Sequence, residues 1–178
     1  MLFPTTISRW VLHRHRMRRI NMTFDLIIFD SESANVAAMK ASFSGMGSIT
    51  VLQTERMLYL EPPPNIDVLY LPLAASAKWG SRPLVHLSQV LPTTAEDQEK
   101  GLPAFVVTGC CLAPSDPRGP VPEMTLLLNC VFDAIRAFND ENNFKLRRIG
   151  FWGYDLLRGL SPDELKSIVV RVVPELTR

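Results

Sequence analysis

Short apolar runs recur along the chain and alternate with segments that have the spacing of helices. The runs are rich in β-branched and aromatic residues, which is typical of buried strands. Five strands are predicted, at residues 24–30, 48–54, 66–73, 102–112 and 146–154. Because these runs are apolar on both faces, we expect a mainly parallel sheet covered on two sides.

Helical spacing is clearest in two segments between the first and last strands. Residues 34–47 place Val36, Met39 and Phe43 at helical spacing, and serines at 31 and 33 are candidate caps. Residues 123–142 form the clearest helix. Its apolar stripe consists of Leu127, Cys130, Val131, Ala134 and Phe138.

A last helix is predicted to begin at Ser161. Ser161 as N-cap, Pro162 at the first helical position and Glu164 at the third form a capping box. The remaining connections are read as loops: a small-residue loop at 74–86 that enters a helix near 85–91, a charged surface connection at 93–101, and a proline-rich surface loop at 113–122.

In a parallel sheet, ligands bind in the loops that follow the carboxyl ends of the strands. Here these are the loops after Leu73, Cys111 and Trp152. The last of them, "GYDLLRG" at 153–159, runs between two glycines into the capped helix, which is the layout of a phosphate-binding loop.

The length of 178 residues and the 47% hydrophobic content indicate one globular domain, placed at residues 22–178. No apolar run approaches the 18 residues that a membrane-spanning helix needs, so a soluble protein is expected. Residues 1–21 hold five arginines and no acid, and subtracting them from the net charge of +1 leaves −4 for the domain. This balance gives no electrostatic case for nucleic-acid binding by the domain.

Residues 1–21 can be read in three ways. They can be a disordered leader or a mis-set start with the true one at Met22, an arginine-rich targeting peptide, or a nucleic-acid-binding arm. The first reading is preferred, because "MTFDLIIFD" is a natural beginning for a domain.

The three cysteines, Cys110, Cys111 and Cys130, are an odd number in a chain without a signal peptide. Reduced thiols and a cytoplasmic location are therefore expected. On a strand the adjacent pair points to opposite faces and makes a poor metal site, so small core residues are the preferred interpretation. The sequence predicts no metal site and no cofactor.

In this order of elements the chain resembles a macro domain, in particular the variant found among phage-tail-type macro proteins. "LIIFDSESANVAAMKASF" is similar to the opening strand and helix of that variant, "IDVLYLPLAAS" to its "DAIVNAANS" strand, and "RRIGFWGYDLLRGLSPDEL" to "SVAIPGLGTGVGGLPPEEA". The resemblance covers residues 24–175 and implies a three-layer α/β/α sandwich with a mixed, mostly parallel sheet. Macro domains bind ADP-ribose, and some hydrolyse ADP-ribose esters.

The resemblance implies a set of ligand-binding positions. The acid that contacts the adenine amino group falls on Glu55, and the "NAAN" tetrad falls on residues 71–74, where both asparagines are replaced. The implied ligand-binding residues are Glu55, Ala74, Ala75, Gly80, Gly153, Tyr154, Asp155, Leu156, Leu157, Arg158 and Gly159.

The centre of the second phosphate loop departs from the family. Asp155 would place a negative charge beside a diphosphate, an unfavourable contact of roughly 1 kcal/mol or more. Leu156 and Leu157 can donate N–H groups if their side chains point inward, and Arg158 can bind phosphate in a bidentate manner. Alternatively, Asp155 and Arg158 pair with each other and close the loop.

Three functions remain open from the sequence. The preferred one is a non-catalytic module that binds ADP-ribose or a related nucleotide, with no catalytic residue assigned. The second is an ADP-ribosyl hydrolase, which the loss of "NAAN" disfavours. The third is an interaction or structural protein whose pocket is closed by the leucines of "DLLRG".

Overall fold

The computed structural model describes residues 23–55, 65–72, 88–109, 119–143 and 145–177. Within these residues the strands are β1 (Asp25–Asp30), β2 (Ile49–Gln53), β3 (Val68–Pro72), β4 (Gln89–Pro92), β5 (Phe105–Gly109) and β6 (Arg148–Trp152). The helices are α1 (Ser33–Ser42), α2 (Ala95–Glu99), α3 (Pro120–Asn142), α4 (Gly153–Leu157) and α5 (Pro162–Val172), followed by a 3-10 turn at Pro174–Thr177. None of these helices is both long and apolar enough to cross a membrane.

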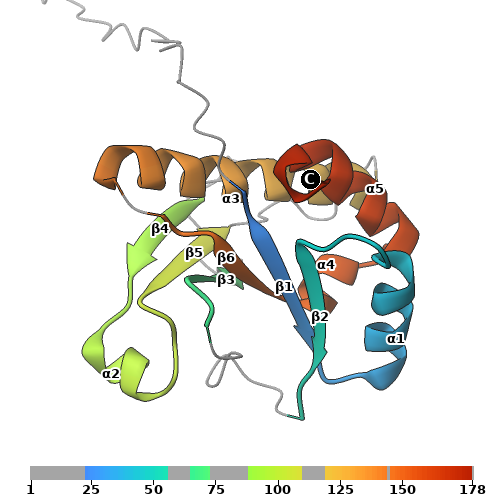
Figure 1. Ribbon diagram of the computed structural model, residues 1–178, viewed down its shortest axis with the longest axis horizontal. Coiled ribbons are helices and arrows are strands. Elements are labelled where there is room, and N and C mark those ends of the chain that lie inside the picture. The colour runs from blue at the N-terminus through green and yellow to red at the C-terminus, as the bar shows by residue number, and fades with distance from the viewer. Residues whose placement is uncertain (1–22, 56–64, 73–87, 110–118, 144, 178) are drawn as a thin grey trace, which may run out of the picture.

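The strands form a single sheet in the order β2-β1-β6-β3-β5-β4 (Figure 1). Every neighbouring pair is parallel except β4 and β5, which are antiparallel at one edge. The fold class predicted from the sequence, an α/β sandwich with a mixed, mostly parallel sheet, is confirmed. The five strands other than β4 run in the same direction. Their carboxyl ends therefore lie along one side of the sheet, which is called its carboxyl edge below.

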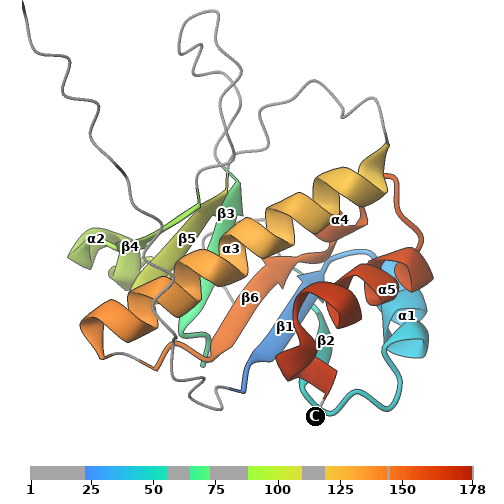
Figure 2. The same ribbon diagram turned by 90° about the horizontal axis from the view of Figure 1, so that it is seen from above.

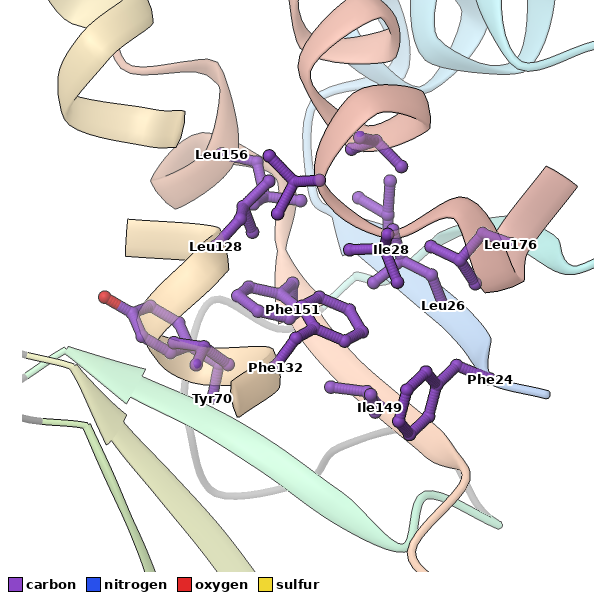
Figure 3. Close-up of a cluster of buried hydrophobic side chains, with 14 of the residues drawn as sticks. Phe24, Leu26, Ile28, Tyr70, Leu128, Phe132, Ile149, Phe151, Leu156 and Leu176 are labelled. Atoms are coloured by element: carbon purple, nitrogen blue, oxygen red, sulfur yellow. The ribbon is translucent and has the colours of Figure 1, made fainter. Parts of the chain in front are cut away.

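One face of the sheet is covered by α1, α3 and α5. Figure 2 shows α3 lying across the strands, with α5 beside it near β1 and β2 and α1 next to α5, beyond β2. Val36, Met39 and Phe43 of the first helical segment are buried against this face, as their spacing predicts. The cluster beneath the helices joins aromatic and aliphatic side chains of both layers, among them Phe132 of α3 and Phe151 of β6 (Figure 3).

The opposite face of the sheet carries a smaller apolar cluster. Its buried members are Ile27, Phe29, Ile66, Leu69, Val106 and Trp152. The Phe29 and Trp152 rings pack edge to face with centroids 4.4 Å apart, a favourable arrangement for an aromatic pair. Because residues at alternate positions of β1 fill both clusters, the sequence pattern of strands apolar on both faces is explained.

Two connections contain elements that the sequence did not predict. Residues 89–92 are an edge strand, so the helix expected near 85–91 is wrong for its described part; antiparallel pairing with β5 fixes the extended conformation there. The charged connection at 93–101 contains α2, which begins with a capping box between Thr94 and Asp97. The strand conformation of residues 89–92 is determined by pairing with β5, and the helix α2 by its capping box. Neither element is determined by apolar periodicity.

The boundaries of the later elements also differ from the prediction. The proline-rich loop was expected to reach residue 122, but α3 begins at Pro120, because the first turn of a helix has no intrahelical acceptors for its N–H groups and tolerates proline. The last strand ends at Trp152 rather than 154. The capping box of Ser161 and Glu164 with Pro162 at the start of α5 is confirmed.

Candidate ligand site at the carboxyl ends of the strands

The segment 153–159 follows β6, which lies between β1 and β3 in the middle of the sheet. The sequence interpretation of this segment as a loop is wrong in its first part, because Gly153–Leu157 form the short helix α4. Gly159 has φ of 72°, a left-handed conformation that glycine adopts without strain. The two predicted glycines therefore bracket a turn of helix rather than an open loop.

Gly153 is required by the close approach of Asp30 from β1. A Cβ atom added at residue 153 would lie 2.6 Å from Asp30 Oδ2 and 3.0 Å from Asp30 Cβ. Neither atom can move easily, since Asp30 Oδ1 accepts a hydrogen bond from the backbone N–H of Glu32 at 2.9 Å and Oδ2 accepts one from Asn35 Nδ2 at 3.3 Å. The absence of a side chain at 153 allows β6 and α4 to pack directly against the end of β1.

Asp30 was not among the residues predicted for the site. Its side chain is buried, and it satisfies the start of α1, where Glu32 is the N-cap and has no capping hydrogen bond of its own. The predicted capping role of the serines at 31 and 33 is therefore wrong. An aspartate that closes an apolar strand and lies two residues before the N-cap of a helix is a sequence signal that could have indicated this role.

Asp155 and Arg158 form an ion pair within the segment, with 3.0 Å between Asp155 Oδ1 and Arg158 Nη2. The Asp155 side chain is 2% exposed, whereas that of Arg158 is 47% exposed. Asp155 Oδ2 is buried and has no hydrogen-bond partner among the described residues. The pair thus joins a buried carboxylate to a guanidinium at the surface, and it realises the alternative in which these two residues close the loop.

The environment of Asp155 changes its protonation. Burial raises the pKa of the Asp155 carboxyl above its ordinary value, and the hydrogen bond and charge of Arg158 oppose this shift without cancelling it. Between the ordinary value, about 4, and the raised one, the folded protein binds more protons here than the unfolded chain does. The contribution of this group to stability therefore falls as the pH rises through that window.

Substitution of Asp155 by asparagine should remove this pH dependence. As the pH rises above about 4, we expect the free energy of unfolding of the wild type to fall relative to that of Asp155→Asn. Above the raised pKa, the difference between the two free energies should become constant. Urea unfolding of both proteins at a series of pH values measures the difference. A constant difference across the whole range would contradict an elevated pKa for Asp155.

The remaining side chains of the segment divide between the interior and the surface. Leu156 is fully buried in the main cluster, and Leu157 is partly buried against it. Both leucines therefore point inward, as their use as N–H donors would require. Tyr154 is 49% exposed, and its ring lies 6.1 Å from that of Trp152. The surface of the segment is consequently formed by an aromatic ring and a guanidinium.

The other predicted site residues lie on the neighbouring strands or outside the described residues. Glu55 is exposed and follows β2 at the same edge of the sheet, but β1 separates β2 from β6, which places it roughly 10 Å away at the usual strand spacing. Leu71 and Pro72 end β3 on the other side of β6. Ala74, Ala75 and Gly80 lie outside the described residues, as do Cys110 and Cys111.

Neither a metal centre nor a reactive thiol is indicated within the described part of the chain. No group of three or more histidine, cysteine, aspartate or glutamate side chains there could hold a metal ion. Cys130 on α3 is partly buried, and burial together with the charge of Asp133 raises the pKa of its thiol. A thiol with a raised pKa is a poor nucleophile at neutral pH.

A separate open hollow of about 340 Å³ lies between the end of α1 and β2. Its lining includes Lys40, Phe43, Met46 and Ile49. These residues come from the carboxyl end of α1 and the start of β2, whereas the segment 153–159 follows the carboxyl end of β6. The hollow is therefore a different location from the candidate site.

Comparison of the chain with protein-family models, curated proteins and solved structures finds no match. The resemblance to macro domains accordingly stays an expectation from the sequence.

Proposed function

We propose that the protein is a macro-domain-like module that binds ADP-ribose or a related nucleotide without catalysis, with the segment 153–159 as part of the binding surface. The observation that carries the proposal is the division of this segment into buried anchors and exposed polar groups. Tyr154 and Arg158 are about half exposed, while Asp155 and Leu156 are buried.

The chemistry of the two exposed groups suits a nucleotide. A tyrosine ring offers a flat face on which a base or ribose can pack. Arginine has five N–H donors in a planar fork that matches a phosphate group. The hydrogen bond to Asp155 uses one amino group, Nη2, of that fork.

The inward direction of Asp155 removes an objection raised by the sequence. A carboxylate in the centre of the loop would repel a diphosphate if it were exposed beside it. With 2% of its side chain exposed and Arg158 bound to it, Asp155 presents little charge to a ligand at the surface. The loop can therefore lack the central glycines of the family and still accept an anion through a side chain.

One observation favours the interaction-protein alternative. Leu156 fills the main core, so the centre of the segment is closed by its own side chain. A module of this kind would use the exposed Tyr154 ring for contacts with another protein, and it would have no affinity for a nucleotide.

Calorimetric titration with ADP-ribose tests the proposal. We expect saturable binding by the wild type, and a loss of at least tenfold in affinity for Arg158→Ala, because a charged hydrogen bond to phosphate contributes about 1.5–3 kcal/mol. Arg147→Ala is the matched control, since Arg147 is exposed and precedes the amino end of β6, at the opposite edge of the sheet. Its affinity should equal that of the wild type.

Absence of heat at millimolar ADP-ribose would reject the proposal and leave the interaction-protein alternative. Release of ADP-ribose from a modified protein, measured in parallel, would replace the binding module by the hydrolase.

A further inference from the structure

We infer that an anionic ligand binds to the segment 153–159 by drawing Arg158 away from Asp155, and that Asp155 then takes up one proton from the solvent. The inference rests on the proposed function and adds a regulatory property to it: the affinity for the anion depends on pH through a residue that the ligand does not touch.

The geometry of the ion pair leads to this coupling. Within the part of the chain that the structure describes, the Asp155 carboxylate accepts one hydrogen bond, from Arg158 Nη2 to Oδ1 at 3.0 Å. The second oxygen, Oδ2, is buried and has no hydrogen-bond partner among the described residues. A carboxylate in this position relies on Arg158 for compensation of its charge, whereas Arg158 is 47% exposed and can reach a ligand at the surface.

The charged groups of the adjoining elements do not replace Arg158. Helix α4 packs against β1, β6 and α5. From β1, Asp30 is itself an acid and is bound by Glu32 and Asn35. The only charged residue of β6, Arg148, lies at the far end of that strand.

The segment also meets α3, through Leu128, and α1, through Met39. On α3 the first-turn charge is the acid Glu123, and Arg136 is bound by Asp133 and Glu175. The charged residue of α1, Lys40, lines the hollow beside β2.

On α5 the charged side chains nearest to the segment have other partners. Asp163 accepts a hydrogen bond from Ser42 Oγ at 2.7 Å, Glu164 caps the helix through Ser161, and Lys166 Nζ donates to the backbone oxygen of Ser42. Arg171, further along, donates to Thr125 Oγ1. Within the described residues, therefore, no second cation is positioned to compensate Asp155.

Loss of Arg158 to a phosphate would leave a buried carboxylate without a counter-charge. Such a group becomes neutral by binding a proton rather than remaining ionised in an apolar site. Burial already raises the pKa of Asp155 against the opposing effect of Arg158, so removal of Arg158 moves the pKa further in the same direction. The balance of the step is one ligand and one proton bound, and the hydrogen bond between Arg158 and Asp155 is broken.

Calorimetry in buffers of different ionisation enthalpy measures the protons taken up. The ligand is ADP-ribose, whose diphosphate diester does not titrate between pH 6 and 9, so any proton taken up belongs to the protein. We expect up to about one proton bound per ADP-ribose and an affinity that falls as much as tenfold for each unit rise in pH. Asp155→Asn, which cannot titrate, should bind with no proton uptake and with an affinity independent of pH.

Asp163→Asn is the matched control, because Asp163 is an exposed acid of the adjacent helix α5. This variant should retain the proton uptake of the wild type. If Asp155→Asn fails to fold, the proton uptake of the wild type by itself tests the inference.

Binding of ADP-ribose by the wild type without proton uptake would overturn the inference and leave the proposed function intact. Equal proton uptake by the wild type and a folded Asp155→Asn would also overturn it, by assigning the proton to another group. No binding of ADP-ribose at all would reject the proposed function, and the ligand-driven exchange with it.

Discussion

Replacement of Leu156 by alanine is expected to destabilise the protein by about 2–5 kcal/mol, the usual cost of removing a large side chain from a packed core. Leu156 is fully buried and belongs to the main cluster together with Leu128 of α3 (Figure 3). Because α4 has only five residues, it cannot be stable alone and depends on this contact for its position. Urea unfolding followed by circular dichroism measures the loss.

Leu157→Ala is the matched control for this effect. Leu157 is the next residue of the same helix but is only partly buried. We expect its substitution to cost clearly less than that of Leu156. Equal losses for the two variants would mean that the helix is oriented differently, and the division of the segment into buried and exposed groups would be wrong.

Replacement of Asn139 by alanine is expected to cost about 2–4 kcal/mol, because it leaves two buried backbone groups without partners. Asn139 lies near the end of α3 and is 3% exposed. Its side chain accepts a hydrogen bond from the N–H of Leu146 at 2.9 Å and donates one to the carbonyl of Leu146 at 3.0 Å. These bonds fix the chain just before β6, the strand that carries the candidate site.

Asn142→Ala is the matched control, because it removes an exposed asparagine from the same end of α3. Asn142 lies one turn later in α3 and also donates a hydrogen bond to a backbone carbonyl, that of Phe138, but it is exposed. Its substitution should change the free energy of unfolding by no more than about 0.5 kcal/mol. A similar loss for both variants would contradict the role of Asn139 as a buried bridge to Leu146.

Much of the fold could be predicted from the sequence because its main signals are strong ones. The strand Asp25–Asp30 has an unbroken apolar centre at residues 26–29, and α5 begins with a complete capping box at Ser161. In contrast, β4 has four residues with a single buried side chain, Val90. A strand of this kind is determined by its partner, β5, and contains little local information.

The position of the candidate site could be predicted from the sequence, but the packing of its side chains could not. The glycines at 153 and 159 and the capped helix after them indicate a turn at the carboxyl edge of the sheet. The close approach of Asp30 to Gly153 depends on β1 and β6 being neighbours, although 122 residues lie between Asp30 and Gly153 in the chain. The burial of Leu156 likewise depends on α3, and the position of α4 on α5. No local pattern distinguishes this arrangement from an open loop.

The most direct measurement of the central claim, that the segment 153–159 is the ligand-binding surface, is the change in backbone amide NMR shifts on titration with ADP-ribose. We predict that the largest changes occur at Tyr154–Gly159 and that they saturate together with the calorimetric binding curve. No change at millimolar ligand would contradict the claim. Changes confined to the hollow lined by Lys40 and Met46, with none at Tyr154–Gly159, would contradict it equally.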